Sequence, residues 1–398
     1  MKKYLIILAV LTTNISVLGQ DLDSVYNNYN SAQTLRTSKG GKLLMAAYGE
    51  AHYNQGFGNN TIQNGVVDVH RQVMLFGYKF DNRTSFITEI EVEHINEWFL
   101  EQAFLNYEAK PWLNIQAGLV LIPMGIVNEY HEPTTFNGVE RPLIDKVMVP
   151  STWRELGAGI VGNVPSKSFR YQLFAVNGPL GWDPNDDSKR LTGKAPIRAG
   201  RQKGSQTAMR TPDLSAKINY YGIKGLNIGA ALYMGVTESL AFGSVNRDST
   251  AAVASADSSV VGVSMIGLDF RYQNKNFEAR GQMIYGNYSN TNQYNEFADA
   301  DLGTKAYGYY LECGYNIGKM LKLKRKVVPF VRYSQFDTHY ETNDELQKNN
   351  TYVQDIVTTG ISWFVSESFV AKGDYQYIVN GNDVKSHTAN FGVGYWFR

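Results

Sequence analysis

Apolar and polar side chains alternate along residues 387–398. Phe391, Val393 and Phe397 fall on one face of a strand and Asn390 falls on the other, because successive side chains of a strand point to opposite faces. One face suits lipid and the other suits water. A strand of this kind with an aromatic end is typical of the closing strand of a transmembrane β-barrel.

The same alternation recurs along the chain in segments of about nine to eleven residues or more, the length that a tilted membrane strand needs. Leu113, Ile115 and Ala117, for example, alternate with Asn114 and Gln116. The pattern predicts about sixteen strands, near residues 42–54, 66–80, 84–96, 98–109, 112–122, 154–163, 168–177, 212–222, 226–236, 259–272, 276–288, 304–317, 327–338, 353–365, 368–379 and 386–398. The connection between residues 95 and 98 is short for an external loop, which leaves a count differing by two as an alternative.

Short and long connections alternate along the chain between these strands. The long ones are residues 123–153, 178–211, 237–258, 289–303 and 339–352. Short periplasmic turns and long external loops are characteristic of outer-membrane barrels, and an even strand number brings both ends of the barrel to one side. We therefore predict an all-β fold, a transmembrane antiparallel barrel of about sixteen strands.

The N-terminus has the pattern of a secretory signal peptide. Lys2 and Lys3 precede an apolar run at residues 5–11, and small residues lead to Gly19. The run is too short to span a bilayer. We expect a signal peptide at residues 1–19, a short N-terminal segment at 20–41 and a barrel at 42–398, located in the outer membrane of a Gram-negative bacterium and surrounded by its lipid.

Composition excludes several function classes. Without Lys2 and Lys3 the 38 basic residues become 36 against 37 acidic ones, so no net field attracts nucleic acid. The only cysteine is Cys313, which reads as a small apolar residue of a strand face. His131-Glu132 lacks the second histidine of a metalloprotease motif, and no Gly-x-Ser-x-Gly or phosphate-binding loop is present. We expect no enzymatic activity, no cofactor and no metal site.

Five short motifs between residues 101 and 162 resemble the phosphate-selective porin O and P family. They are residues 101–107 (EQAFLNY), 115–118 (IQAG), 122–125 (IPMG), 140–142 (ERP) and 154–162 (RELGAGIVG). The resemblance implies a sixteen-stranded porin, usually a homotrimer, whose third external loop folds into the channel and narrows it. Residues 123–153 follow the fifth predicted strand, where the third external loop belongs.

The predicted lumen face carries both charge signs. Its candidate pore residues on strands are Arg170, Arg280, Arg332 and Lys372 against Glu91, Glu93 and Glu312, and those in loop 123–153 are Glu140, Arg141 and Lys146. Rings of one sign would select ions of the other. The simpler explanation of each charge is a lumen salt bridge or a solvated wall residue, and that of Arg141 and Glu140 is that they pin the loop to the wall.

Loop 178–211 is predominantly basic, with Arg198, Arg201 and Lys203 among its cations. It could collect anions at the mouth, bind lipid phosphates, or simply be solvated.

Two functions from different classes follow. The first is a porin for passive diffusion of small hydrophilic solutes, anionic ones included, through a water-filled lumen narrowed by loop 123–153. The second is a plugged barrel that serves as a scaffold and docks an envelope protein partner. Conductance in planar bilayers separates them.

Overall fold

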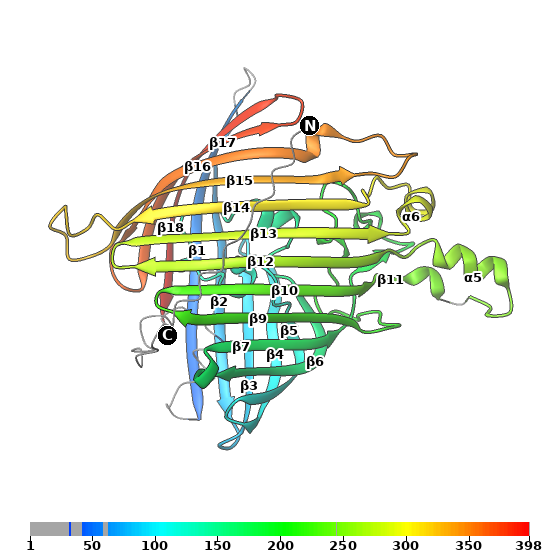
Figure 1. The fold of residues 1–398 in the computed structure, drawn as a ribbon, viewed down its shortest axis with the longest axis horizontal. Helices are drawn as coiled ribbons and strands as arrows, with labels where there is room; N and C mark the ends of the chain where they lie inside the picture. Colours follow the sequence, from blue (N-terminus) through cyan, green and yellow to red (C-terminus); the bar gives the residue numbers. More distant parts are fainter. Residues whose placement is uncertain (1–31, 33–41, 59–62, 244, 398) are drawn as a thin grey trace, which may run out of the picture.

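The computed structural model describes residues 32, 42–58, 63–243 and 245–397. Within them, sixteen antiparallel strands form a closed barrel (Figure 1). The wall strands are β1 (Leu43–Phe57), β2 (Val66–Lys79), β3 (Thr84–Glu93), β4 (Glu97–Lys110), β5 (Leu113–Leu121), β6 (Arg154–Val164), β7 (Phe169–Val176), β9 (Asp213–Ile223), β10 (Leu226–Val236), β12 (Gly262–Asn274), β13 (Phe277–Ser289), β14 (Lys305–Tyr315), β15 (Val327–Glu341), β16 (Val353–Phe364), β17 (Phe369–Asn380) and β18 (Lys385–Phe397). The predicted fold class and strand count are confirmed.

The predicted signal peptide, residues 1–19, lies outside the described residues. So does the predicted segment 20–41 apart from Ala32, which is buried beside Phe104 and Val120. Among the described residues, no helix combines the length and the apolar character needed to cross a membrane.

The barrel closes where β1 pairs with β18, with Gly49 opposite Tyr395. On β18 the side chains of Phe391 and Val393 are 59% and 43% exposed, whereas Asn390 is fully buried on the lumen side. The predicted alternation is therefore confirmed for this strand. Pairing of the first and last strands removes the free sheet edges that could not exist in lipid.

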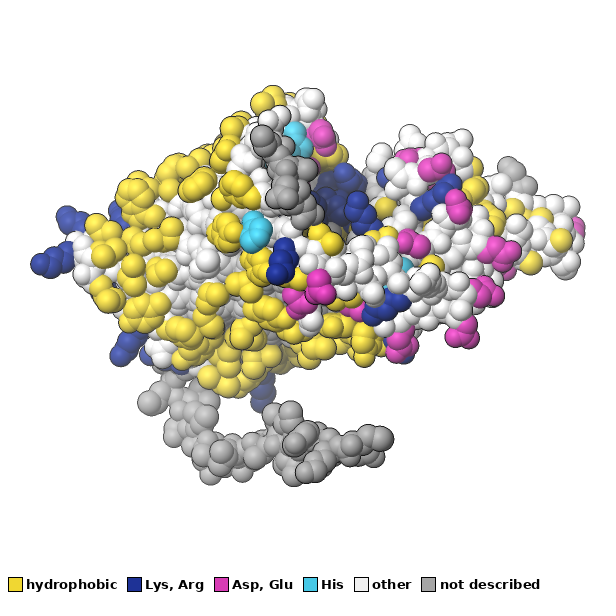
Figure 2. All heavy atoms as spheres, turned by 90° about the horizontal axis from the view of Figure 1, so that it is seen from above, with side chains coloured by type: hydrophobic (Ala, Val, Ile, Leu, Met, Phe, Trp, Pro, Cys, Tyr) yellow, Lys and Arg dark blue, Asp and Glu magenta, His cyan; other side chains and the backbone are white. Residues whose placement is uncertain are grey.

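The outer face of the barrel is an apolar band, which Figure 2 shows as a zone of hydrophobic side chains across the middle of the molecule. Exposed members come from strands around the wall and include Leu105, Ile115, Leu173, Ile218, Ile228, Leu268, Leu311, Val331 and Ile361. A soluble protein would bury such residues. A lipid-facing barrel exposes them to hydrocarbon instead.

The two ends of the barrel differ in their connections. At one end, which we call the turn end, tight turns such as that between β9 and β10 join the strands. The other end, called the loop end, carries the parallel pair β8 (Leu180–Trp182) and β11 (Glu238–Ser239) with α5 (Thr250–Asp257) and α6 (Thr291–Ala298) (Figure 1). Short 3-10 helices are η1 (Pro165–Lys167), η2 (Asp187–Lys189), η3 (Arg198–Gly200), η4 (Leu240–Phe242) and η5 (Asn350–Tyr352).

The ends also differ in charge. Figure 2 shows basic side chains at the turn end and most of the visible acidic ones on the loop side. The longest connection at the turn end, between β14 and β15, carries Lys319, Lys322, Lys324, Arg325 and Lys326.

The connection between β5 and β6, residues 122–153, enters the barrel, and we call it the lumen loop. It contains α3 (Ile126–Glu129) and α4 (Ile144–Val147). We divide it into a tip, residues 131–141, and a base, residues 122–130 and 142–153. The base forms an apolar core with wall residues of the lumen side, and the members of this core include Ile122, Met124, Ile126, Ile144, Met148, Trp153, Val161, Phe174, Val263, Met265 and Ile284. The base of the loop thus packs against the lumen face of the wall.

Candidate functional site in the barrel lumen

Cationic side chains from four wall strands hold the tip of the lumen loop. Each donates a hydrogen bond to a backbone carbonyl, so the tip crosses the bore rather than lying along one side. The pairs are Arg71 of β2 with His131, Arg280 of β13 with Thr135 (2.8 Å), Arg332 of β15 with Asn137 (2.6 Å) and Lys372 of β17 with Phe136 (2.9 Å). These partners lie 60 to 236 residues apart in the chain.

Wall carboxylates complete the tip's contacts on the side of β13 to β17. Glu312 of β14 pairs with both Arg280 (3.0 Å) and Arg332 (2.7 Å), and it accepts a hydrogen bond from the Asn137 amide (3.1 Å). Asp374 of β17 accepts the Val139 backbone N–H at 2.6 Å. The predicted pore residues Arg280, Arg332 and Glu312 are therefore brought together.

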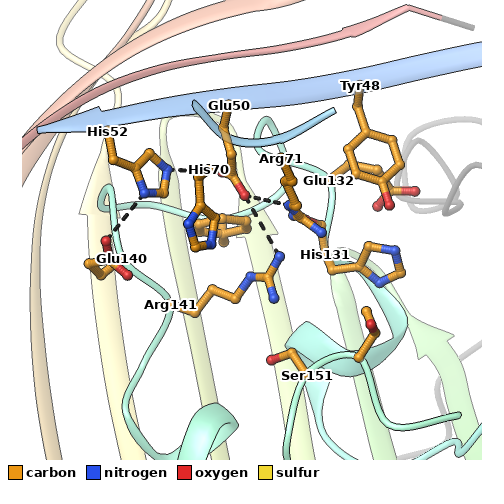
Figure 3. A network of polar contacts seen from close by, with 12 residues as sticks. Tyr48, Glu50, His52, His70, Arg71, His131, Glu132, Glu140, Arg141 and Ser151 are labelled. Atoms are coloured by element: carbon orange, nitrogen blue, oxygen red, sulfur yellow. Dashed lines mark hydrogen bonds and ion pairs between the residues drawn. The ribbon is translucent and has the colours of Figure 1, made fainter. Parts of the chain in front are cut away.

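Next to the barrel closure, Glu50 of β1 lies between Arg71 (2.6 Å) and Arg141 (3.7 Å), as Figure 3 shows. His52 of β1 faces Glu140, with its Nδ1 atom 3.2 Å from the carboxylate. Burial alone would raise the pKa of Glu140, but the contact with His52 lowers that pKa to about 2. Glu140 therefore stays ionised down to strongly acidic pH.

The base carries buried polar groups within its apolar surroundings. Lys217 of β9 pairs with Glu129 (2.5 Å) and Asp269 (2.8 Å). Asp145 accepts a hydrogen bond from Gln282 at 2.9 Å. Burial raises the pKa of Asp145 to about 7, because little charge compensation reaches it there.

The remaining predicted pore residues do not join one site. Glu91 is buried on β3 at 3.9 Å from Arg71, and Glu93 is half-buried near the loop end of the same strand. Arg170 lies on β7, 5.8 Å from the ring of Tyr221. Lys146 is exposed on α4.

Near the loop end of the lumen, four cations gather, which we call the basic cluster: Arg154, Arg198, Arg201 and Lys203. Lys203 lies 4.1 Å and Arg154 lies 5.6 Å from the ring of Phe99, and Arg201 donates to the Ser151 carbonyl at 3.1 Å. Burial and repulsion from Arg198 and Arg154 lower the pKa of Arg201 to about 9. Burial and repulsion from Arg201 and Arg154 lower the pKa of Lys203 to about 8. The four groups thus concentrate positive potential.

On the turn side of the tip lies a cavity of about 1260 Å³. Thr135 and Phe136 of the tip are part of its lining. Its charged lining is predominantly basic, with Lys224, Arg271, Lys275, Arg280, Lys324, Arg325 and Lys326 against Glu278 and Glu367. One of these cations, Arg325, pairs with Glu367 at 3.0 Å. We call this space the basic vestibule.

Sequence reasoning missed two features of this site. Arg71 and Glu50 were not singled out, although both fall on lumen positions of predicted strands. The basic vestibule was missed because many of its cations lie in turns, where no strand alternation indicates which way a side chain points. The run of cations at residues 319–326 was the signal that could have revealed it.

Comparison with known proteins identifies a distant relative and a shared fold. No protein-family model matches the chain, so the resemblance to phosphate-selective porins stays a prediction. An uncharacterized protein of Aquifex aeolicus is 26% identical over 351 residues, covering 84% of this chain and 75% of that protein.

Solved structures with a similar fold are outer-membrane proteins. The channel DcaP of Acinetobacter baumannii superposes with a TM-score of 0.58 at 11% identity, covering 90% of this chain and 99% of that one. OmpF of Salmonella typhi gives 0.57 at 9% identity, covering 89% and 97%. The trimer form of OmpT from Vibrio cholerae gives 0.52 at 9% identity, covering 90% and 100%. At these identities the likeness establishes the barrel fold.

Proposed function

We propose that the protein is an outer-membrane porin that lets small hydrophilic solutes, with a preference for anions, diffuse passively across the membrane. The observation that carries this proposal is the excess of cationic over acidic side chains on both sides of the lumen loop. The basic cluster lies toward the loop end and the basic vestibule toward the turn end. The fold is that of DcaP, whose description names it a channel.

The wall charges support an anion preference once their pairing is taken into account. Glu312 is neutralised by Arg280 and Arg332, and Asp269 is paired with Lys217. Such buried pairs contribute little net potential to the solvent. The loop and turn cations are less compensated, so they dominate the potential along the water-filled part of the path.

We assign Arg280, Arg332 and Lys372 mainly to anchoring the lumen loop. Their charged groups already donate to tip carbonyls, so little of their hydrogen-bonding capacity is available to a solute. A specific phosphate site needs several free donors that converge on one point. We therefore expect phosphate in a chloride background to block the current only weakly.

The assembly that we propose is a homotrimer in the outer membrane of a Gram-negative bacterium, with the turn end in the periplasm. OmpT, which shares the fold, has been solved in a trimer form. Periplasmic turns are short and external loops long in barrels of this class, which sets the orientation.

Planar-bilayer recordings test the function. Purified protein should give a stable ohmic conductance, with a reversal potential in a potassium chloride gradient that reports anion preference. Replacing Arg201→Gln and Lys203→Gln together should shift that potential toward cations. Lys194→Gln, an exposed cation of the same loop, is the matched control and should leave it unchanged.

The pH dependence sharpens this test. A cation carries its charge below its pKa, and the pKa values are about 8 for Lys203 and about 9 for Arg201. Anion preference should therefore weaken as the pH rises from about 7 to about 10, and the double variant should lose most of this change. A parent channel that prefers cations at pH 7 would refute the anion proposal.

The second candidate is a plugged barrel that acts as a scaffold for an envelope protein. One observation favours it: the lumen loop contacts strands spread around the bore, since its tip is held from β2, β13 and β17 and its base from β9. Electrically silent protein that co-purifies with a fixed partner would support this candidate over the channel.

A further inference from the structure

Three of the six histidines of the chain gather at one place on the lumen wall. His52 of β1 stacks on His70 of β2, with ring centroids 4.6 Å apart and planes 15° apart. His94, in the turn between β3 and β4, meets the edge of His70 at 5.4 Å. The labelled side chains of His52 and His70 lie next to each other in Figure 3.

Asp68 connects two of these rings. Its Oδ2 atom lies 2.6 Å from Nδ1 of His94 and 3.4 Å from Nδ1 of His70. These three atoms lie within 4.8 Å of one another. Two imidazole nitrogens and one carboxylate oxygen thus face a common point.

We propose that Asp68, His70 and His94 form a binding site for a divalent transition-metal ion of the Zn²⁺ class. Ligand atoms about 2.0–2.1 Å from a tetrahedral ion lie about 3.3 Å apart, which is close to the 3.4 Å between Asp68 and His70. The contact between Asp68 and His94 is shorter and opens by under about 1 Å when an ion replaces the proton that the two atoms share.

The ligand chemistry selects the class of ion. Imidazole nitrogens suit zinc, copper and nickel, whereas magnesium and calcium prefer sites built from oxygen atoms alone. Three protein ligands leave a fourth position open to water or to a small solute. The site is accessible to an ion, because the side chains of His70, Asp68 and His94 are 28%, 22% and 46% exposed.

The other group of ligand-type side chains within the described residues suits an ion less well. Glu89, Glu101 and His131 also face one another, but all three are buried. The Tyr48 hydroxyl donates to both carboxylates, at 3.0 and 2.7 Å. An ion would therefore have less access to that group than to the half-buried Asp68 and His70 and the exposed His94.

This proposal departs from the sequence analysis, which expects no metal site, and it does not depend on the porin proposal. The sequence places His94 at 26 residues from Asp68, outside the spacing of familiar metal motifs. Strand pairing brings them together, because Arg71 of β2 is opposite Glu93 of β3 and the adjacent residues His70 and His94 then become neighbours.

Zn²⁺ titration of the untagged, chelator-treated protein in detergent tests the proposal by calorimetry. The parent should bind one Zn²⁺ per chain, and Mg²⁺ at the same concentration should not compete. His94→Asn and Asp68→Asn should each weaken binding by at least about tenfold, since each removes a ligand. His387→Asn, which lies outside the cluster, is the matched control and should bind like the parent.

His94→Asn is suited to this test because His94 has a φ angle of 48°, a conformation that asparagine tolerates. The fold of each variant is checked by its heat-dependent gel migration. Electron paramagnetic resonance of Cu²⁺ bound to the protein gives a second readout, with two coordinated imidazole nitrogens in the parent and one in His94→Asn. Equal Zn²⁺ affinity in the parent and in both ligand variants, or the same Cu²⁺ spectrum, would overturn the proposal.

Discussion

The base and the tip of the lumen loop are held in the same barrel by different interactions. In the base, Ile122, Met148 and Trp153 are fully buried in an apolar core shared with the wall. In the tip, backbone carbonyls accept hydrogen bonds from Arg280, Arg332 and other wall cations. Apolar packing is non-directional and supplies the larger share of stability. Directed charge-assisted bonds fix where the backbone lies.

Two carboxylates of this loop show the same difference. Asp145 in the base has a pKa raised to about 7 by burial, whereas the pKa of Glu140 in the tip is held at about 2 by His52 despite its burial. The environment of Asp145 favours the neutral carboxylic acid, whereas that of Glu140 favours the ionised carboxylate. The base is therefore suited to stability, and the tip to a defined position across the path of a solute.

Removal of the tip should have the largest effect. Deleting residues 131–141 removes the backbone that crosses the bore, and the narrowest part of the path controls its resistance. We expect single-channel conductance to rise several-fold in planar bilayers. A deletion of residues 343–349, in the loop between β15 and β16, is the control and should change conductance little. An unchanged conductance after the first deletion would show that the tip does not constrict the path.

Truncating a large apolar side chain of the base should have the next largest effect. Trp153→Ala leaves a cavity beside Tyr233, whose ring centroid lies 4.6 Å from that of Trp153, and should lower the free energy of unfolding by about 3–5 kcal/mol. Denaturant unfolding in detergent, followed by far-ultraviolet circular dichroism, measures the loss. Trp363→Ala on the outer face, where the side chain is 48% exposed, should cost clearly less. Equal losses would contradict the assignment of stability to the base.

A single anchor of the tip should matter less. Arg332→Met removes one donor from Asn137 and one partner from Glu312, which keeps Arg280. We expect a loss of about 1.5–3 kcal/mol, the usual range for a hydrogen bond to a charged group, with noisier and larger single-channel currents because the tip is less fixed. Val331→Ala, its lipid-facing neighbour, is the control. Currents as steady as those of the parent would mean that the remaining anchors suffice.

The pH dependence of stability should give the smallest and most specific difference. An acid whose folded pKa is raised contributes stability below its unfolded value, and loses it as the pH rises through the folded pKa. For Asp145 this decline spans from the ordinary aspartate pKa of 3.8 to its folded pKa of about 7. The free energy of unfolding, measured between pH 4 and 8, should decrease as the pH rises. Asp145→Asn should reduce this decrease. Glu140→Gln should leave the decline in place, since the pKa of Glu140 lies far below this window.

Much of the barrel was predictable because its signal is local. All sixteen wall strands were predicted, with ends within a few residues of the observed ones. The short turn from Glu93 to Glu97 did not change the count. The helices α3 to α6 and the strands β8 and β11 were not predicted, because short elements in loops depend on contacts such as that of the Tyr294 hydroxyl with Gly181 rather than on a periodic pattern.

The candidate site was predictable only as a set of residues. The alternation of side chains along each strand placed four residues on the lumen face: Arg280, Arg332, Lys372 and Glu312. It could not distinguish a charge that lines the pore from one that anchors the loop. That distinction depends on carbonyls of the tip that lie up to 236 residues away in the chain. The same limit hid the meeting of Asp68 with His94.

The sequence by itself determined the barrel and the face that meets lipid, because every outward position of every strand must be apolar where it contacts hydrocarbon. Which lumen charges pair with each other, which hold the tip, and which stay available to a solute or a metal ion were decided only by the tertiary structure. Charges act over a few ångströms of space, and strand pairing and loop insertion set those distances between residues that sequence order keeps far apart.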